Sequence, residues 1–477
     1  MHRVGPSDHS VEVEIVEVRD PADARRDRLG ASGGMAQGAR PHAGWLGAAV
    51  LAGLGLVVLV ANIHEARQEA ARLDDLSVAG VLRLIDGPVE EVWRVPGGQL
   101  LANSPEAIVL VDLPGDAGLR GIDPTTGAVL WHREIAPDET CLAVGGHDGQ
   151  DSADAPVLVV CGPVLDTDHP VTGPVQVRAL DARAGHESGV LELPTAPMTL
   201  DVVDDDLVIS RIGERAAVQV LRWDPGAGRV VWSYRSEPGV ADALLRDGWW
   251  NSVVDRGVLW LGQERVIALA VASGQEVPAD DPPAFWSAGG TATLADGGVV
   301  EWAHDRAGDS TGSRVLDEDG TLRFTFAGEP WLAPLSDGSR PDVLPMRRLG
   351  TLDVVGLDPR TGEQLWAART LQGMYPYLQL DGVVVATGSL RAIGLDLASG
   401  ARLWEEPIAR PRTWPVTDGR SVLLLTREGG MLGMSAIDLR TGAERWWTQM
   451  PASATYLDVG GADTVLVHTP TEVIAYR

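Results

Sequence analysis

Short runs of apolar residues, broken by polar turn-forming residues, follow one another through most of the chain. Between residue 81 and the end, runs such as YLQL and GVVVAT before Gly394 are separated by Gly, Asp and Pro. Runs of this length bounded by turn-formers are typical of β-strands. The pattern predicts an all-β domain over residues 81–477.

One apolar run near the start is much longer. Ala43–Ile63 holds 21 residues without a charge, and at about 1.5 Å per helical residue it covers the roughly 30 Å core of a bilayer. Arg25, Arg26, Arg28 and Arg40 precede the run, whereas only Arg67 and Arg72 follow it closely. By the positive-inside rule the N-terminus is cytoplasmic and the all-β domain is extracytoplasmic.

The expected organisation therefore has four parts. A disordered cytoplasmic tail occupies residues 1–42, a transmembrane helix 43–63, a charged linker helix 64–80 and the all-β domain 81–477. The protein is predicted to be a single-pass plasma-membrane protein held by a signal anchor. A cleaved signal peptide is the alternative, but the charged region before the apolar run is longer than such peptides carry.

A repeated motif organises the large domain. Each copy reads small, aliphatic, Asp, two variable residues, Thr or Ser, Gly, three variable residues and Trp, as in GLDPRTGEQLW. One copy has Ala in place of the hydroxyl residue, and another has lost its Trp. The motif residues are Asp123, Gly127 and Trp131; Asp181 and Gly185; Asp224, Gly228 and Trp232; Asp358, Gly362 and Trp366; Asp396, Gly400 and Trp404; and Asp438, Gly442 and Trp446.

The spacing of the Asp residues reveals two degenerate copies. Asp181 and Asp224 are 43 residues apart, Asp358 and Asp396 are 38 apart and Asp396 and Asp438 are 42 apart, but Asp224 and Asp358 are separated by 134. The interval contains Ala268–Val277, with Ala at the Asp position, and Val315–Phe324, with a shortened turn. Repeats of this period are typical of a propeller in which each period forms one blade.

The motif has the chemistry of a β-hairpin. An Asp side chain accepts hydrogen bonds from turn amides, and Gly adopts the positive φ that other residues resist. The Trp on the following strand is expected to pack against the neighbouring blade. The last strand, in TEVIAYR, has no partner after it, and PVEEVWRV (Pro88–Val95) resembles a final strand without its predecessors. We expect these two segments to pair and close the ring.

The frame A-x-D-x-x-T-G-x-x-x-W resembles the repeat of the pyrroloquinoline-quinone-like (quinoprotein-type) propellers. The resemblance covers roughly residues 81–477 and implies four-stranded antiparallel blades, commonly eight, with each Trp docking one blade on the next. The hairpins of this chain number as many as nine. We expect eight blades, with seven and nine as the alternatives.

The net charge limits the possible partners, and the two cysteines suggest a possible disulfide. A formal net charge of −28 argues against nucleic acid as a partner, because phosphate binding needs a basic surface. Cys141 and Cys161 lie in two strand-like runs of one blade, where adjacent antiparallel strands outside the cytoplasm can carry a disulfide. A structural disulfide and two free thiols remain equal alternatives at this stage.

No catalytic, cofactor-binding or metal-binding residue can be assigned. The quinone enzymes of the family commonly use a vicinal cysteine pair, whereas these two cysteines are 20 residues apart. The acidic runs Asp204–Asp206 and Asp317–Asp319 lack the alternating spacing of a calcium loop, so acidic turns are the preferred interpretation. Seven further tryptophans are expected to fill the core between blades, with a binding surface as the alternative: Trp249, Trp250, Trp260, Trp286, Trp302, Trp331 and Trp414.

We therefore predict a non-enzymatic, membrane-anchored propeller that binds a protein or an envelope component. The segment Ala136–Pro174, rich in Asp and Gly, is the expected loop insertion on the binding surface. The alternative is an extracytoplasmic oxidoreductase that depends on pyrroloquinoline quinone with calcium, or on another metal. The identity of the partner and the oligomeric state do not follow from the sequence.

Overall fold

The computed structural model describes most of residues 81–477, which belong to one structural unit, Gln68–Arg477. Within this range it does not describe residues 105, 113–117, 137–138, 145–156, 164–172, 204, 246–251, 256, 263–265, 279–289, 305–309, 352, 370, 372, 389, 411–414 and 461–462. The predicted tail, transmembrane helix and linker lie outside the described residues. In the part that is described, no helix is long and apolar enough to cross a membrane.

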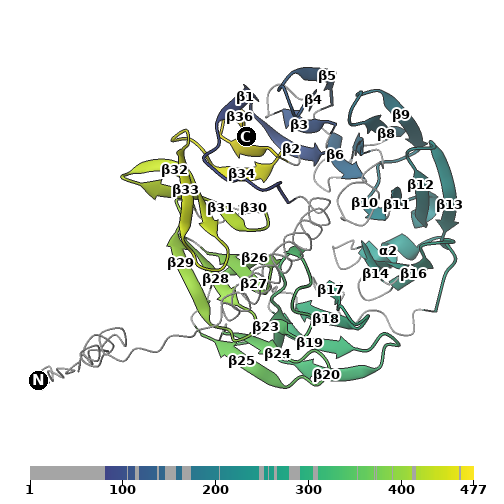
Figure 1. The fold of residues 1–477 in the computed structure, drawn as a ribbon. Helices are drawn as coiled ribbons and strands as arrows, with labels where there is room; N and C mark the ends of the chain where they lie inside the picture. Colours follow the sequence, from purple (N-terminus) through teal and green to yellow (C-terminus); the bar gives the residue numbers. More distant parts are fainter. Residues whose placement is uncertain are drawn as a thin grey trace, which may run out of the picture. The chain divides into compact units, whose positions relative to one another are not determined.

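The described residues form nine sheets that follow one another around a ring (Figure 1). We call them blades 1–9. Blades 1–3 consist of β2 (Gly98–Asn103), β3 (Ile108–Asp112), β4 (Gly118–Ile122) and β5 (Val129–Glu134); β6 (Glu139–Val144), β7 (Leu158–Pro163), β8 (Val175–Asp181) and β9 (Glu187–Leu193); and β10 (Thr199–Val203), β11 (Asp206–Ile212), β12 (Val218–Asp224) and β13 (Arg229–Arg235).

The short helix η2 (Glu214–Ala216) lies between β11 and β12 of blade 3, and α2 (Val240–Leu245) lies in the connection from blade 3 to blade 4. Blades 4–6 consist of β14 (Ser252–Asp255), β15 (Val258–Gly262) and β16 (Val266–Ala270); β17 (Gly290–Thr293), β18 (Val299–His304), β19 (Ser310–Leu316) and β20 (Leu322–Phe326); and β21 (Gly328–Pro330), β23 (Leu344–Arg348), β24 (Val354–Leu357) and β25 (Gln364–Ala368).

Blades 7–9 complete the ring. They consist of β22 (Leu335–Ser336), β26 (Tyr375–Leu380), β27 (Val383–Thr387), β28 (Arg391–Asp396) and β29 (Arg402–Pro407); β30 (Val416–Thr417), β31 (Ser421–Glu428), β32 (Met431–Asp438) and β33 (Glu444–Gln449); and β34 (Tyr456–Val459), β35 (Val465–His468), β36 (Glu472–Tyr476) and β1 (Glu91–Pro96).

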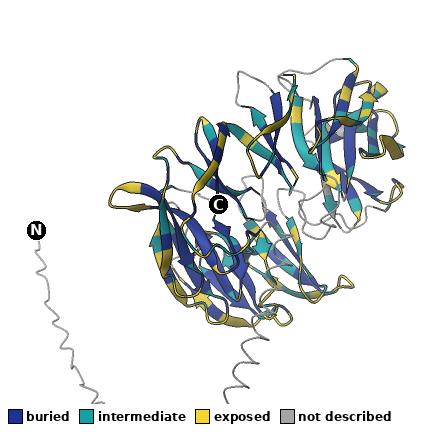
Figure 2. Cartoon of the chain, turned by 45° about the horizontal axis from the view of Figure 1, so that its top comes forward, coloured by how far each residue is buried: buried dark blue, intermediate teal, exposed yellow. Residues whose placement is uncertain are grey.

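Burial within a blade follows the position of each strand. The second strands are mostly buried, because neighbouring blades cover both faces, and β27, with the sequence VVVAT, is buried along its whole length. The outermost strands, such as β25, alternate between exposed and buried positions, since only one face packs on a neighbour. Figure 2 shows the same arrangement, with buried residues concentrated in the middle of the blades.

The ring closes by pairing the two ends of the domain, as the sequence predicted. In blade 9, β1 pairs antiparallel with β36, and Val95 lies opposite Val473. The backbones of Glu90 and Arg477 extend the pairing by exchanging two hydrogen bonds of 2.9 and 3.0 Å. Strand β1 therefore completes a sheet whose other strands come from the C-terminal end.

The prediction of eight blades is wrong, because the described residues form nine, the number kept as an alternative. Both degenerate motif copies lie in sheets of their own. The copy at Ala268–Val277 still makes a turn after β16, because Leu269 of β16 forms an isolated antiparallel bridge with Glu276. Blade 4 nevertheless has only three strands. Backbone pairing and apolar alternation suffice to form a blade even where the motif's Asp and Trp are missing.

Motif tryptophans connect successive blades through one repeated contact. The side chain lies so close to the turn glycine of the next blade that a Cβ there would come within 2.6 Å of it. These glycines have φ between 63° and 71°, so both their conformation and the space exclude a side chain. The pairs are Trp93 with Gly127, Trp131 with Gly185, Trp232 with Gly274, Trp366 with Gly400, and Trp404 with Gly442.

The indole N–H of each tryptophan completes the contact. It donates to the carbonyl of the residue after the motif Asp position, or after Ala270 in blade 4, at 2.7–3.1 Å. The acceptors are Pro124, Ala182, Val271, Leu397 and Leu439. Trp446 of blade 8 donates instead to Ile85, 3.3 Å away, so the segment before β1 supplies the acceptor for the closing blade. A buried indole thus gains both packing and a satisfied polar group.

Two seams without a motif tryptophan use substitutes. Between blades 2 and 3, Gly189 stands at the tryptophan position, and the fully buried Trp223 of blade 3 packs beside it. Between blades 5 and 6, Phe324 lies against Gly362, and Arg323 donates to the carbonyl of Pro359. At these two seams, other aromatic side chains therefore pack where the contact of the motif tryptophan would lie.

We predict that Trp404→Ala destabilises the domain strongly. The side chain is 8 % exposed and connects blades 7 and 8, so its removal should lower the free energy of unfolding by about 3–5 kcal/mol. Urea unfolding followed by circular dichroism measures the change. Leu403→Ala is the matched control, because this neighbour on β29 is 39 % exposed and should cost less than about 0.5 kcal/mol. Equal losses in both variants would contradict the role assigned to the indole.

Candidate functional site

The motif aspartates lie in the turns between the third and fourth strands of their blades. Asp123 Oδ1 accepts hydrogen bonds from the amides of Thr125 and Thr126 at 2.9 and 2.8 Å. Asp358 accepts from Arg360 and Thr361 at 2.8 and 3.0 Å. Asp181, Asp224, Asp396 and Asp438 make corresponding turn bonds. These carboxylates serve the backbone, as the hairpin interpretation predicts.

These turns and the loops between the first and second strands share one end of the blades, which we call the turn end. There, arginines two positions after a motif Asp form ion pairs with the preceding blade. Arg183 meets Glu106 at 3.1 Å, and Arg440 meets Asp381 at 2.6 Å. The pairs are exposed, so each contributes little stability, but they give this end a mixed charge. The sequence showed these arginines without indicating their partners, because the partners lie in another repeat.

The turn end also carries an insertion that the sequence did not reveal. Residues 331–343 leave blade 6 after β21, place β22 beside β26 of blade 7 in parallel pairing, and return to β23. Trp331 anchors the insertion: it is 2 % exposed, and its Nε1 donates to the carbonyl of Met374 at 3.2 Å. Beyond this anchor, the backbone amides of Asp381 and Gly382 donate to Asp337 and Ser339.

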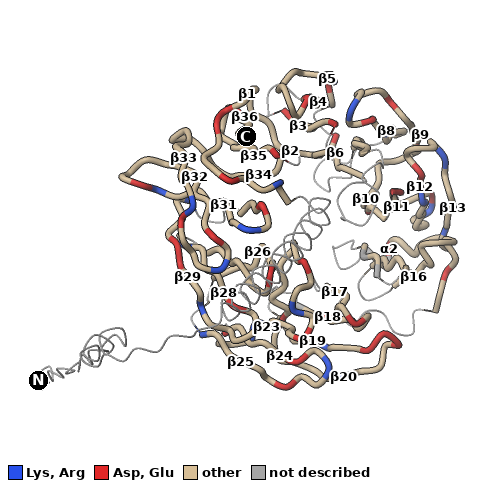
Figure 3. The backbone as a smooth tube through the Cα atoms, in the orientation of Figure 1, with Lys and Arg blue, Asp and Glu red and all other residues tan. Residues whose placement is uncertain are grey.

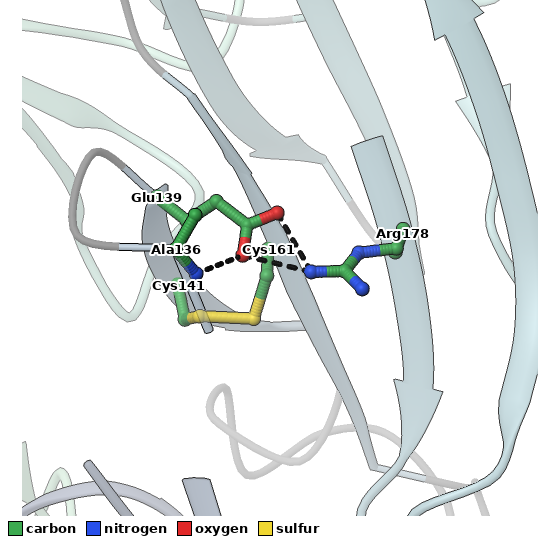
Figure 4. The surroundings of a disulfide bond; sticks show 5 residues. All are labelled: Ala136, Glu139, Cys141, Cys161 and Arg178. Carbon is green, nitrogen blue, oxygen red and sulfur yellow. Dashed lines mark hydrogen bonds and ion pairs between the residues drawn. A yellow bond between two sulfur atoms is a disulfide. The ribbon is translucent and has the colours of Figure 1, made fainter. Parts of the chain in front are cut away.

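The two cysteines form a disulfide between the first and second strands of blade 2 (Figure 4). Cys141 on β6 lies directly opposite Cys161 on β7, with Cα atoms 4.1 Å apart and sulfurs at 2.09 Å. Beside the bond, both carboxylate oxygens of Glu139 accept from Arg178 Nη2 at 2.7 Å. The disulfide flanks the connection 145–156, which lies within the predicted insertion Ala136–Pro174 and outside the described residues.

The acidic runs are parts of ordinary turns where the structure describes them. Asp206 pairs with Arg222, Asp317 pairs with Arg323, and Asp319 accepts the amide of Thr321 at 2.9 Å. In the described part of the chain, no three His, Cys, Asp or Glu side chains converge as a metal site would require. Figure 3 shows acidic residues distributed over most of the sheets rather than gathered on one.

The additional tryptophans that are described lie in or against the core. Trp260 and Trp331 are buried, and Trp302 packs against the apolar cluster between blades 5 and 6. This placement agrees with the preferred interpretation for these three residues. The remaining ones, Trp249, Trp250, Trp286 and Trp414, lie outside the described residues.

A buried histidine in blade 9 is a structural residue. His468 is 2 % exposed and stacks on Tyr456 with ring centroids 4.1 Å apart. Burial lowers the pKa of His468 to about 4, so the imidazole is neutral at physiological pH. A neutral ring suits the interior of the blade.

The sequence model of one family, described as outer membrane protein assembly factor BamB, matches residues 81–234 and 262–477. The chain belongs to this family. The unmatched residues 235–261 include α2, β14 and most of β15, and therefore coincide with the three-stranded blade 4. Membership of the BamB family agrees with the resemblance to quinoprotein-type propellers inferred from the motif.

Several solved structures are similar to this BamB-family chain. BamB from Moraxella catarrhalis is 16 % identical, with 82 % of this chain and 100 % of that chain covered and a TM-score of 0.40. Quinohemoprotein alcohol dehydrogenase from Comamonas testosteroni is 12 % identical, with 84 % and 79 % covered and a TM-score of 0.38. The Dos1 propeller is 13 % identical, with 82 % and 97 % covered and a TM-score of 0.41. No curated protein matches the chain.

We predict that removing the disulfide destabilises blade 2. The bond joins residues 20 apart, and closing a loop of this size contributes about 3 kcal/mol by restricting the unfolded chain. The double variant Cys141→Ser, Cys161→Ser should lose that amount in urea unfolding. A reductant should lower the free energy of unfolding of the wild-type protein to that of the variant, and should leave the value for the variant unchanged. A reductant effect on the variant would show that another process is being measured.

We predict that the motif turns weaken in acid. Amide hydrogen bonds from Arg360 and Thr361 hold the pKa of Asp358 below its usual value, and those from Thr126 and Thr125 lower that of Asp123. A carboxyl group with a lower pKa in the folded state stabilises the fold above its unfolded pKa, about 3.9, and this contribution disappears as the pH falls further. The urea midpoint should therefore fall on acidification below about pH 4. Asp358→Asn should show a smaller fall, and parallel profiles would contradict the assignment.

Proposed function

We propose that this protein is a membrane-anchored extracytoplasmic scaffold that binds a partner protein through the turn end of its blades. The observation that carries the proposal is the use of the repeat residues. Each described motif Asp holds a turn, and the motif glycines and tryptophans join blades. The repeat therefore builds a rigid frame and leaves recognition to the loops. Membership of the BamB family supports a scaffold.

The location outside the cytoplasm has two supports. The apolar run 43–63 and its arginine-rich N-terminal flank favour a signal anchor with the domain outside. The disulfide in blade 2 suits an oxidising compartment, because cytoplasmic thiols are kept reduced. The same cysteines face each other across two strands and are not the neighbouring pair that the quinone enzymes of the family commonly use.

The turn end is the preferred surface because it carries the insertion 331–343 between β21 and β23 of blade 6. This insertion exposes Asp342, whose side chain is 61 % exposed, next to Arg340. Loops of this length on a rigid ring are suited to binding another protein.

The test places a photo-crosslinking amino acid at Asp342 in the full-length chain in its own membrane. We expect one crosslinked protein, which should also bind the purified wild-type chain. Met431, 49 % exposed beside the turn at the opposite end of blade 8, is the control position and should give no crosslink to that protein. Crosslinks of equal yield from both positions, or none from Asp342, would contradict the proposed surface. Recovery of the chain in the soluble cytoplasmic fraction would contradict the anchor.

A further inference from the structure

Two arginines lie on either side of a glutamine on blade 3. Arg211 on β11 is directly opposite Gln219 on β12, and Gln219 is directly opposite Arg235 on β13. Residues directly opposite on neighbouring strands project from the same face of a sheet. The three side chains therefore form a row with a guanidinium at each end and an amide between them, which we call the arginine row.

The arginine row lacks a carboxylate partner among the described residues. Elsewhere in the same blade, Arg222 pairs with Asp206 and Arg229 pairs with Asp224. Neither Arg211 nor Arg235 forms such a pair with any described residue, including the nearby Glu214 and Glu237. Two unpaired like charges repel each other. Burial and the positive charge of Arg235 both lower the pKa of Arg211.

Arg211 also has an unused donor. Its Nη1 donates to Thr195 Oγ1 at 3.3 Å, but its Nε is buried and meets no acceptor among the described residues. A buried charged donor needs an acceptor. Water can fill that role, but the neighbouring charge of Arg235 favours an anion over a neutral molecule.

The amide between the arginines is held in place. A Cβ at Gly213 would lie 2.6 Å from Cδ and Nε2 of Gln219, so the absence of a side chain at Gly213 leaves room for this amide. Gly213 and Thr195 lie in connections at the end of blade 3 opposite the turn end. The row is on the face that packs on blade 2, because Ile209 of the same strand face belongs to the core between these blades.

We propose that the arginine row binds an oxyanion of the phosphate class. Two guanidinium groups and an amide offer more donors than the two oxygens of a carboxylate can use. A tetrahedral phosphoryl group presents three or four oxygens and is a preferred partner of arginine. The site is separate from the proposed partner surface and does not depend on it. Free phosphate and a phosphoryl group on a larger molecule share this chemistry.

Calorimetric titration of the purified full-length chain in detergent tests the site, with inorganic phosphate, dimethyl phosphate and acetate as probes. We expect phosphate to bind, with affinity that falls as salt rises. Binding of dimethyl phosphate as well would point to a phosphodiester source, and binding of inorganic phosphate alone would point to the free ion. Failure of both to bind, or acetate binding as tightly as phosphate, would overturn the proposal.

Variants locate the binding. Arg211→Gln and Arg235→Gln should each weaken phosphate binding by about tenfold, the effect of losing one charge-assisted hydrogen bond. Gly213→Ala should weaken it without changing the charge, because the added methyl group displaces the Gln219 amide. Arg229→Gln removes one charge from the same strand, outside the row, and should leave binding unchanged. Equal effects of Arg229→Gln and Arg235→Gln would show a general charge effect and overturn the site, while thermal unfolding of each variant checks folding.

Discussion

The contact between a tryptophan of one blade and a turn glycine of the next determines how the domain holds together. An isolated four-stranded blade cannot bury its two apolar faces by itself. The indole covers one seam, and its N–H uses a turn carbonyl that would otherwise be unpaired, as Trp366 does with Leu397. Because the acceptor turn must also have a glycine at positive φ, the Asp, Gly and Trp of the motif are needed together.

Closure depends on the same contact in a modified form. Blade 9 combines strands from both ends of the domain, so it has no complete motif hairpin of its own. The segment before β1 supplies Ile85 as the acceptor for Trp446, while Trp93 on β1 docks on blade 1. The ring is thus continuous in its packing across the position where the chain begins and ends. A propeller closed in this way is a rigid support for the loops of the turn end.

The seams that depart from the rule show which parts of the repeat can change. Trp223 replaces a missing tryptophan from the opposite side of its seam, and Phe324 with Arg323 divides the packing and hydrogen-bonding roles between two side chains. Blade 4 receives Trp232 on Gly274 but carries Pro278 where its own tryptophan would stand. The family match is interrupted at this blade, which is also the one with three strands.

The sequence by itself determined the features that depend on neighbours along the chain. Alternating apolar runs, turn aspartates and glycines are local, so the hairpins could be predicted. The pairing of β1 with β36 could be predicted as well, because each terminal segment carries only part of a repeat. Blade number could not, because a degenerate copy forms a sheet when its backbone finds partners, whatever its motif retains. Strand register creates the parallel pairing of β22 with β26 and the row of Arg211, Gln219 and Arg235. Packing of one blade on the next creates the ion pairs between loops. Only the tertiary structure decides these, because register and inter-blade packing bring together side chains whose sequence separation has no fixed period.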